Sequence, residues 1–165
     1  METEISNQSN CCCPKFDPSI WDEKEFEWQD KLFIKDSIPT FLHTPFPPMI
    51  GNVMTKLWNM AQNADAAPEI KDFLCLVYDP SAWKSEYYIS VNKEVPNIEN
   101  VKLTGTFMTK VFDGSYNDVP NWIKVMDEYL KNKGKQAKKY YFYYTTCPKC
   151  AKIYGHNYVV LFAEI

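Results

Sequence analysis

The sequence predicts an α+β fold in which two tandem strand-helix-strand-strand units form a mostly antiparallel sheet, with pseudo-twofold symmetry and helices on one face. Two segments carry apolar residues at helical spacing, and each has a proline in its first turn, Pro47 and Pro120. Runs typical of strands flank both segments in the same order. A chain of 165 residues is expected to form one domain. We therefore place two repeats at residues 31–92 and 101–165, after an N-terminal arm at residues 1–30.

In the first repeat, the helix is expected from Pro47 to Ala61, and a turn at Asp79-Pro80-Ser81 joins the next two strands. Pro39 predicts a break in the first strand, because proline cannot donate to a strand ladder. The strands are placed at residues 31–34 with a continuation at 41–46, at 73–78 and at 86–91.

The second repeat has the same order of elements. Asn117 or Asp118 is expected to cap its helix, and Gly134 to end it as a left-handed stop. A turn at Asp113-Gly114-Ser115 precedes the helix. The strands are placed at residues 101–112, 140–146 and 158–164.

Composition excludes several classes of protein. The net charge of −3 argues against nucleic-acid binding, which usually requires a basic stripe. The five lysines between residues 131 and 139 fall at a helix end, where a solvated face is the simpler interpretation. No apolar run approaches the ~20 residues of a membrane span, and no signal peptide is recognised, so we expect a cytoplasmic protein. The aromatic content of 16% indicates a packed core or a lined pocket.

Alternation along residues 86–91 separates two faces of one strand. Tyr87, Ile89 and Val91 point one way and are expected against a helix. Glu86, Tyr88 and Ser90 point the other way, and this set suits a wet cleft. The face at the pseudo-twofold seam must be covered, used for a ligand or closed by oligomerisation, for which a homodimer is the simplest form.

Five of the six cysteines form two clusters, at residues 11–13 and in Cys147-Pro148-Lys149-Cys150. A Cys-x-x-Cys turn is a common half of a zinc site, and Cys11 with Cys13 would complete four ligands, with His43 and His156 as fallbacks. Reduced thiols and a disulfide are the alternatives. Thioredoxin-like chemistry is not expected, because the motif is not predicted to open a helix after a buried strand.

The second repeat contains the strand 104–112, the turn Asp113-Gly114-Ser115-Tyr116 and the helix that follows. Through these elements it resembles the gyrase-inhibitor-like (GyrI-like) family of small-molecule-binding domains. The family commonly has proline where Ser115 stands. The segment Tyr144-Thr145-Thr146-Cys147-Pro148-Lys149-Cys150, continuing to Val160, is similar to a stand-alone branch often labelled hydrolase. No helix-turn-helix segment is recognised before the domain, so a transcription-activator role is not expected.

The resemblance implies an aromatic pocket with a buried carboxylate, and a drug-like or toxin-like ligand that is aromatic or electrophilic. Glu86 is the preferred carboxylate, acting as a base that activates water against a strained carbon, with Tyr88 stabilising the leaving oxygen. A solvated edge charge is the alternative for each carboxylate. A non-catalytic protein-interaction module of gyrase-inhibitor type is the rival function. Further ligand-binding candidates are Trp83, Asp113, Tyr116, Tyr141, Tyr143, Tyr158 and Glu164.

Overall fold

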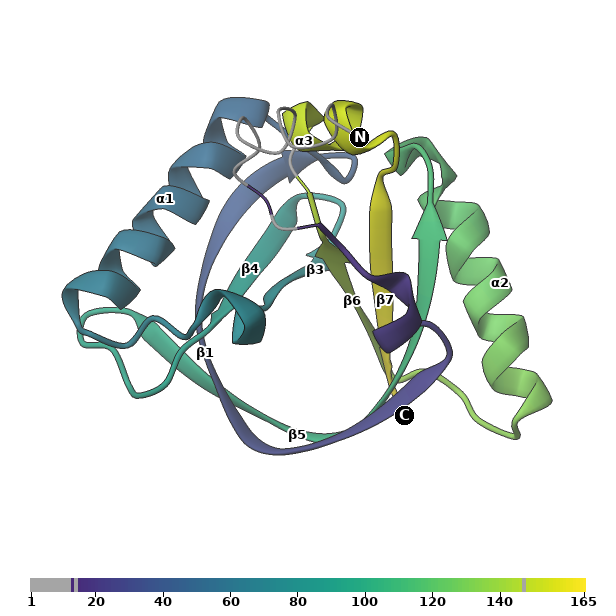
Figure 1. Cartoon of the computed structure of the whole chain (residues 1–165). Helices are drawn as coiled ribbons and strands as arrows, with labels where there is room; N and C mark the ends of the chain where they lie inside the picture. The colour runs from purple at the N-terminus through teal and green to yellow at the C-terminus, as the bar shows by residue number, and fades with distance from the viewer. Residues whose placement is uncertain (1–12, 14, 147) are drawn as a thin grey trace, which may run out of the picture. The chain divides into compact units, whose positions relative to one another are not determined.

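The computed structural model describes residue 13 and residues 15–146 and 148–165. It has the mixed α+β composition that the sequence predicts, with antiparallel strands and helices (Figure 1). The chain divides into two compact units that differ from the two repeats in their boundaries. Unit 1 contains the residues up to Phe26, Met108–Tyr140 and Tyr144–Ile165, and unit 2 contains Glu27–Phe107 and Tyr141–Tyr143.

Unit 2 is built on a sheet with the strand order β2-β1-β4-β3-β6. The helix α1, Pro47–Asn63, begins at the predicted proline and packs against β4. Its buried stripe is Val53, Leu57 and Ala61, three residues at helical spacing. The strands are β1 (Lys24–Phe41), β2 (Thr44–Pro45), β3 (Cys75–Ser81), β4 (Lys84–Ser90) and β6 (Lys139–Tyr144).

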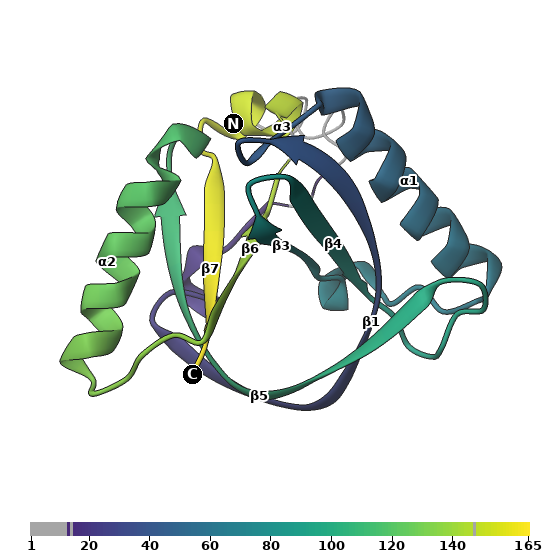
Figure 2. The same cartoon turned by 180° about the vertical axis from the view of Figure 1, so that it is seen from behind.

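Unit 1 contains the helices α2, Val119–Asn132, and α3, Pro148–Tyr154. Its strands are β7 (Tyr158–Glu164), the C-terminal end of β5 (Glu99–Asp113) and both ends of β6. Their order in the sheet is β6-β7-β5. Figures 1 and 2 both show α2 beside the C-terminal end of β5, where Phe112 and Trp122 stack with ring centroids 5.5 Å apart. Gly134 lies just after α2 and has a φ of +70°. It is the left-handed stop that the sequence predicts.

Three local predictions are wrong. The strand β1 begins at Lys24, inside the predicted arm, and it runs through Pro39, which pairs with Lys84. The residues Asp79-Pro80-Ser81 belong to β3, where the register shifts between Tyr78 and Ser81, and not to the hairpin turn. Pro148 opens the unpredicted helix α3, so the argument against helix opening at the Cys-x-x-Cys motif does not hold.

The strand β4 lies in the interior of unit 2. Residues 85–90 are all buried, so the face of Glu86, Tyr88 and Ser90 is removed from the open surface, as is the face of Tyr87 and Ile89. The fully buried apolar neighbours include Phe33 and Ile34 on β1 and Leu76 on β3. The part of the chain that the structure describes contains no helix long and apolar enough to cross a membrane.

Candidate functional site

Strand register places a lysine beside the preferred carboxylate. In the antiparallel β1–β4 pair, Lys35 is the direct partner of Tyr88, and Ser37 is the direct partner of Glu86. Lys35 and Glu86 are therefore diagonal neighbours on one face, a separation that long side chains can span. The carboxylate and the phenol lie on that face because they are two residues apart on β4.

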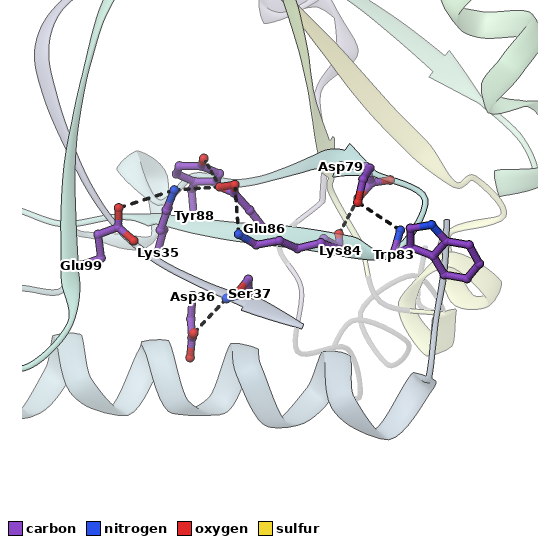
Figure 3. Close-up of polar contacts among 11 residues, drawn as sticks. Lys35, Asp36, Ser37, Asp79, Trp83, Lys84, Glu86, Tyr88 and Glu99 are labelled. Carbon is purple, nitrogen blue, oxygen red and sulfur yellow. Dashed lines mark hydrogen bonds and ion pairs between the residues drawn. The ribbon is translucent and has the colours of Figure 1, made fainter. Parts of the chain in front are cut away.

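The contacts of Glu86 form a compact polar cluster in unit 2 (Figure 3). The Lys35 ammonium donates to Glu86 Oε2 at 2.8 Å, and the Tyr88 hydroxyl donates to the same oxygen at 2.8 Å. Lys84 Nζ lies 4.0 Å from the other carboxylate oxygen, and Glu99 Oε1 lies 3.6 Å from Lys35 Nζ. Glu86 is only 7% exposed, so these contacts replace most of its hydration.

The pKa values follow from burial opposed by these contacts. Burial raises the pKa of Glu86, but the hydrogen bonds from Lys35 and Tyr88 and the positive charges outweigh that effect and hold the pKa below its ordinary value. Burial likewise lowers the pKa of Lys35, yet its contact with Glu86 dominates and the pKa is raised. Burial and donation to the carboxylate raise the pKa of Tyr88. At neutral pH the cluster therefore contains a carboxylate, an ammonium and a neutral phenol.

Aromatic rings surround the polar cluster. The Tyr88 ring meets Tyr141 edge-on at 5.7 Å between centroids, and Phe33 at 6.4 Å. Tyr141 in turn contacts Tyr78 and Phe107 at 5.7 and 6.3 Å. The Lys35 ammonium lies 5.6 Å from the centroid of the Tyr88 ring, within the range of a cation–π contact. A positive charge at this position is thus held by both a carboxylate and a ring face.

The structure brings together only part of the predicted site. Tyr88 contacts both Glu86 and Tyr141, whereas Trp83 is 57% exposed at the tip of the β3–β4 hairpin. The Trp83 ring packs on Phe41 at 5.5 Å and lies away from the Glu86 carboxylate in Figure 3. Tyr143 lies on β6 and is half-buried.

The remaining candidates lie in unit 1. Asp113 is an exposed carboxylate whose Oδ2 lies 2.7 Å from His156 Nδ1, and His156 stacks on Tyr158 at 4.9 Å. Tyr116 is exposed and meets the Tyr144 ring at 5.1 Å. Glu164 is half-buried at the end of β7.

Two of the four predicted zinc ligands, Cys11 and Cys147, lie outside the described residues. Cys150 is buried and disulfide-bonded, and Cys13 is half-buried. Among the described residues no group of three or more metal-ligating side chains occurs. A disulfide sulfur is not a thiolate ligand, so a zinc site that includes Cys150 requires that bond to be reduced. The zinc site stays a prediction.

Sequence reasoning missed Lys35 and Glu99. They were overlooked because a lysine and a glutamate on different strands meet only through the β1–β4 register and the course of β5. His156 was considered only as a fallback zinc ligand, although the tail segment that carries the resemblance leads directly to it. Its partner Asp113 was already a candidate.

The cluster and the fold define a class of protein: an α+β domain with an ionised carboxylate buried among aromatic rings. The chain belongs to the bacterial hydrolase family, whose model matches residues 3–165. The prediction of a GyrI-like domain of the branch labelled hydrolase is thereby confirmed. No curated protein gives a significant match to the sequence.

Solved structures share the fold at low identity. The C-terminal domain of EcmrR has a TM-score of 0.65 and 13% identity, covering 88% of this chain and 97% of that one. A hydrolase from Listeria innocua has a TM-score of 0.57 and 8% identity, covering 87% and 91%. SAV2435, in a structure bound to tetraphenylphosphonium, has a TM-score of 0.50 and 11% identity, covering 87% and 93%.

Proposed function

We propose that this chain binds a small organic molecule at Glu86 and Tyr88 and hydrolyses strained electrophilic compounds there by carboxylate-assisted attack of water. The observation that carries the proposal is the Glu86 carboxylate, which is buried, ionised and bonded to a neutral tyrosine in an aromatic setting. The family name, and the ligand in the SAV2435 structure, support a small-molecule site on this fold.

The proposed reaction adds one water to a strained ring. The water oxygen bonds to the electrophilic ring carbon, while Glu86 accepts the proton that the water loses. The strained carbon–carbon bond breaks, and its electron pair moves to a conjugated oxygen of the substrate. The Tyr88 hydroxyl, which keeps its proton at neutral pH because its pKa is raised, turns from Glu86 to this oxygen and stabilises its charge. The proton held by Glu86 then neutralises the product.

Lys35 controls how strong a base Glu86 can be. A low carboxyl pKa makes a weak base, and Lys35 is one reason that the pKa is low. A substrate that separates the ammonium from the carboxylate removes contacts that lower the pKa of Glu86, so that pKa rises. Substrate binding would therefore strengthen the base at the moment it is needed.

The test uses a cyclopropane-fused cyclohexadienone, followed by the loss of its dienone absorbance and by the mass gain of one water. Glu86→Gln is expected to lower turnover by about 10²–10⁴, the usual share of general-base catalysis. Glu99→Gln is the matched control, because Glu99 also contacts Lys35 but is largely exposed. The control is expected to stay within a few fold of the unchanged protein. Equal turnover by the unchanged protein and Glu86→Gln contradicts the role of Glu86.

A second candidate function is contact with a protein partner. Exposed apolar side chains gather near the two hairpin tips of unit 2, where Phe41 packs on Trp83 and Thr40 N donates to Trp83 O. Such a patch is typical of an interaction surface. If the chain acts as a gyrase inhibitor through this patch, it inhibits DNA supercoiling by gyrase, and Trp83→Ser removes that inhibition. Absence of inhibition by the unchanged protein excludes this candidate.

A further inference from the structure

A cavity in unit 1 is lined by residues other than those of the Glu86 cluster. The cavity has a volume of about 490 Å³, within the range of small-molecule sites. Its wall includes Phe16 and Tyr158, whose ring centroids are 5.4 Å apart. Tyr154 also lines it, and the Tyr154 hydroxyl donates to the backbone oxygen of Cys13 at 2.7 Å. The wall is therefore largely aromatic, which suits a ligand that contains a ring.

His156 is a polar group that is held in place in this wall. Its ring stacks on Tyr158, with the centroids 4.9 Å apart and the planes at 14°. Its Nδ1 lies 2.7 Å from Asp113 Oδ2. Asp113 is itself anchored, because its Oδ1 accepts from the backbone nitrogen of Asn157 at 2.8 Å. The imidazole is thus fixed by a contact on its face and a contact on one edge.

Asp113 decides which nitrogen of His156 carries the hydrogen. Burial raises the pKa of Asp113, but the hydrogen bonds from His156 and Asn157 outweigh it and lower the pKa. An ionised carboxylate only accepts, so Nδ1 carries the hydrogen, and Nε2 of the neutral imidazole is an acceptor. No hydrogen bond to Nε2 is formed by the described residues, and His156 lines the cavity whereas Asp113 does not. The Nε2 lone pair is therefore available to a donor group on a ligand.

The charges at the rim of the cavity do not favour an ion of either sign. Lys15 and Asp17 are both exposed there and carry opposite charges. Hydrogen bonds from the hydroxyl and backbone nitrogen of Ser19 lower the pKa of Asp17, so its carboxylate is charged at neutral pH. Because the two charges offset each other, the selective polar feature that remains is the acceptor on His156. A neutral ligand with a hydrogen-bond donor fits both observations.

We propose that this cavity is a second ligand site, which binds a neutral aromatic molecule carrying one hydrogen-bond donor, such as indole. The donor N–H bonds to His156 Nε2, and the ring packs on the wall formed by Phe16 and Tyr158. The site does not depend on the function proposed for Glu86.

The test compares indole with benzothiophene, which has the same bicyclic shape but sulfur in place of the N–H group. Both are titrated into the full chain by calorimetry at pH 8.5, which favours a neutral imidazole. Indole is expected to bind about three- to tenfold more tightly, the range that one neutral hydrogen bond supplies.

Substitution of each histidine separates the acceptor from the ring. His156→Phe keeps a ring against Tyr158 but removes the acceptor, so the affinities for the two probes are expected to become equal. Binding of benzothiophene is expected to be unchanged in this variant, which shows that the cavity is kept. His43→Phe is the matched control, because His43 belongs to unit 2 and does not line the cavity. It is expected to keep the preference for indole.

The ring nitrogens of His156 provide a second readout. The chain contains two histidines, so His43→Phe assigns their signals in nitrogen-15 NMR of histidine-labelled protein. The spectrum is expected to place the hydrogen on Nδ1 of His156. Indole is expected to shift the Nε2 signal, and benzothiophene is expected to leave it unchanged. Asp113→Asn removes the carboxylate that fixes the tautomer and is expected to reduce the preference for indole.

The outcomes separate this site from the one in unit 2. Glu86→Gln is expected to leave the preference for indole and the shift of His156 Nε2 unchanged, whatever its effect on hydrolysis. Loss of that preference in Glu86→Gln, a preference that survives His156→Phe, or a hydrogen on Nε2 would each overturn the proposal. So would equal affinity of the unchanged protein for the two probes, or a failure of indole to bind it.

Discussion

The Lys35 ammonium lies 2.8 Å from Glu86 Oε2 and 5.6 Å from the centroid of the Tyr88 ring. A lysine of this chain is thus the cation that the buried carboxylate and the Tyr88 ring hold. Substitutions can test the ion pair itself, the hydrogen bond from Tyr88, and the competition between Lys35 and an external cation.

Lys35→Met is expected to lower the free energy of unfolding by about 1–3 kcal/mol at pH 7, because it leaves the buried Glu86 carboxylate without its charged partner. Urea unfolding measures this change. Lys84→Met is the matched control: Lys84 Nζ is 4.0 Å from Glu86 Oε1 and half exposed, so its loss is expected to cost less than about 1 kcal/mol.

The pH dependence of stability in the same variants is an independent test of the ion pair. The pKa of Glu86 in the folded protein is below the reference value of 4.5, so its contribution to stability is present above pH 4.5 and is lost as pH falls through the folded pKa. Lys35→Met removes contacts that lower this pKa, so the folded pKa is expected to rise. The stability that is lost on acidification through that pKa is then expected to be smaller than in the unchanged protein. A Lys35→Met variant with the same pH profile as the unchanged protein would contradict this account.

Tyr88→Phe tests the hydrogen bond from the phenol to the carboxylate. Removing a buried donor to a charged acceptor is expected to cost about 1.5–3 kcal/mol of unfolding free energy. A double-mutant cycle with Glu86→Gln isolates the pair, and the expected coupling is at least about 0.5 kcal/mol. Strict additivity of the two single changes would show that the contact does not contribute.

Much of the fold was predictable because its signals are local. Pro47 and Pro120 mark the starts of α1 and α2, and Gly134 marks the left-handed stop after α2. The start of β1 was also readable: in residues 25–28, aromatic residues alternate with charged ones, and Phe26 and Trp28 are half-buried while Glu25 and Glu27 are exposed. This period of two was overlooked because charged residues dominate the segment.

The candidate site was predictable only in part, because it depends on register between strands. Alternation along β4 correctly groups Glu86 with Tyr88. It does not show that Lys35 faces them, since that follows from the pairing of Lys35 with Tyr88 across β1 and β4. Alternation also suggested one wet face, whereas β4 is covered on both sides, a property set by tertiary packing.

Gly114 provides a stability test at the turn that carries the family resemblance. Its φ of +147° lies in a region that residues with a side chain rarely adopt, so Gly114→Ala is expected to destabilise the protein by about 1–2 kcal/mol. Gly51→Ala is the contrasting control. Gly51 is exposed within α1 with no atom near an added methyl group, so the change is expected to stabilise by up to about 1 kcal/mol. Thermal unfolding of both variants measures whether each is less stable or more stable than the unchanged protein.

The most direct test of the central claim, that Glu86 is where a ligand binds, is calorimetric titration with tetraphenylphosphonium, the cation in the SAV2435 structure. Lys35 competes for the carboxylate, so Lys35→Met is expected to bind this cation at least tenfold more tightly than the unchanged protein. Adding Glu86→Gln to Lys35→Met is expected to abolish the gain. Equal affinity in all three proteins, or a gain that survives Glu86→Gln, would contradict the assignment of Glu86 to the ligand site.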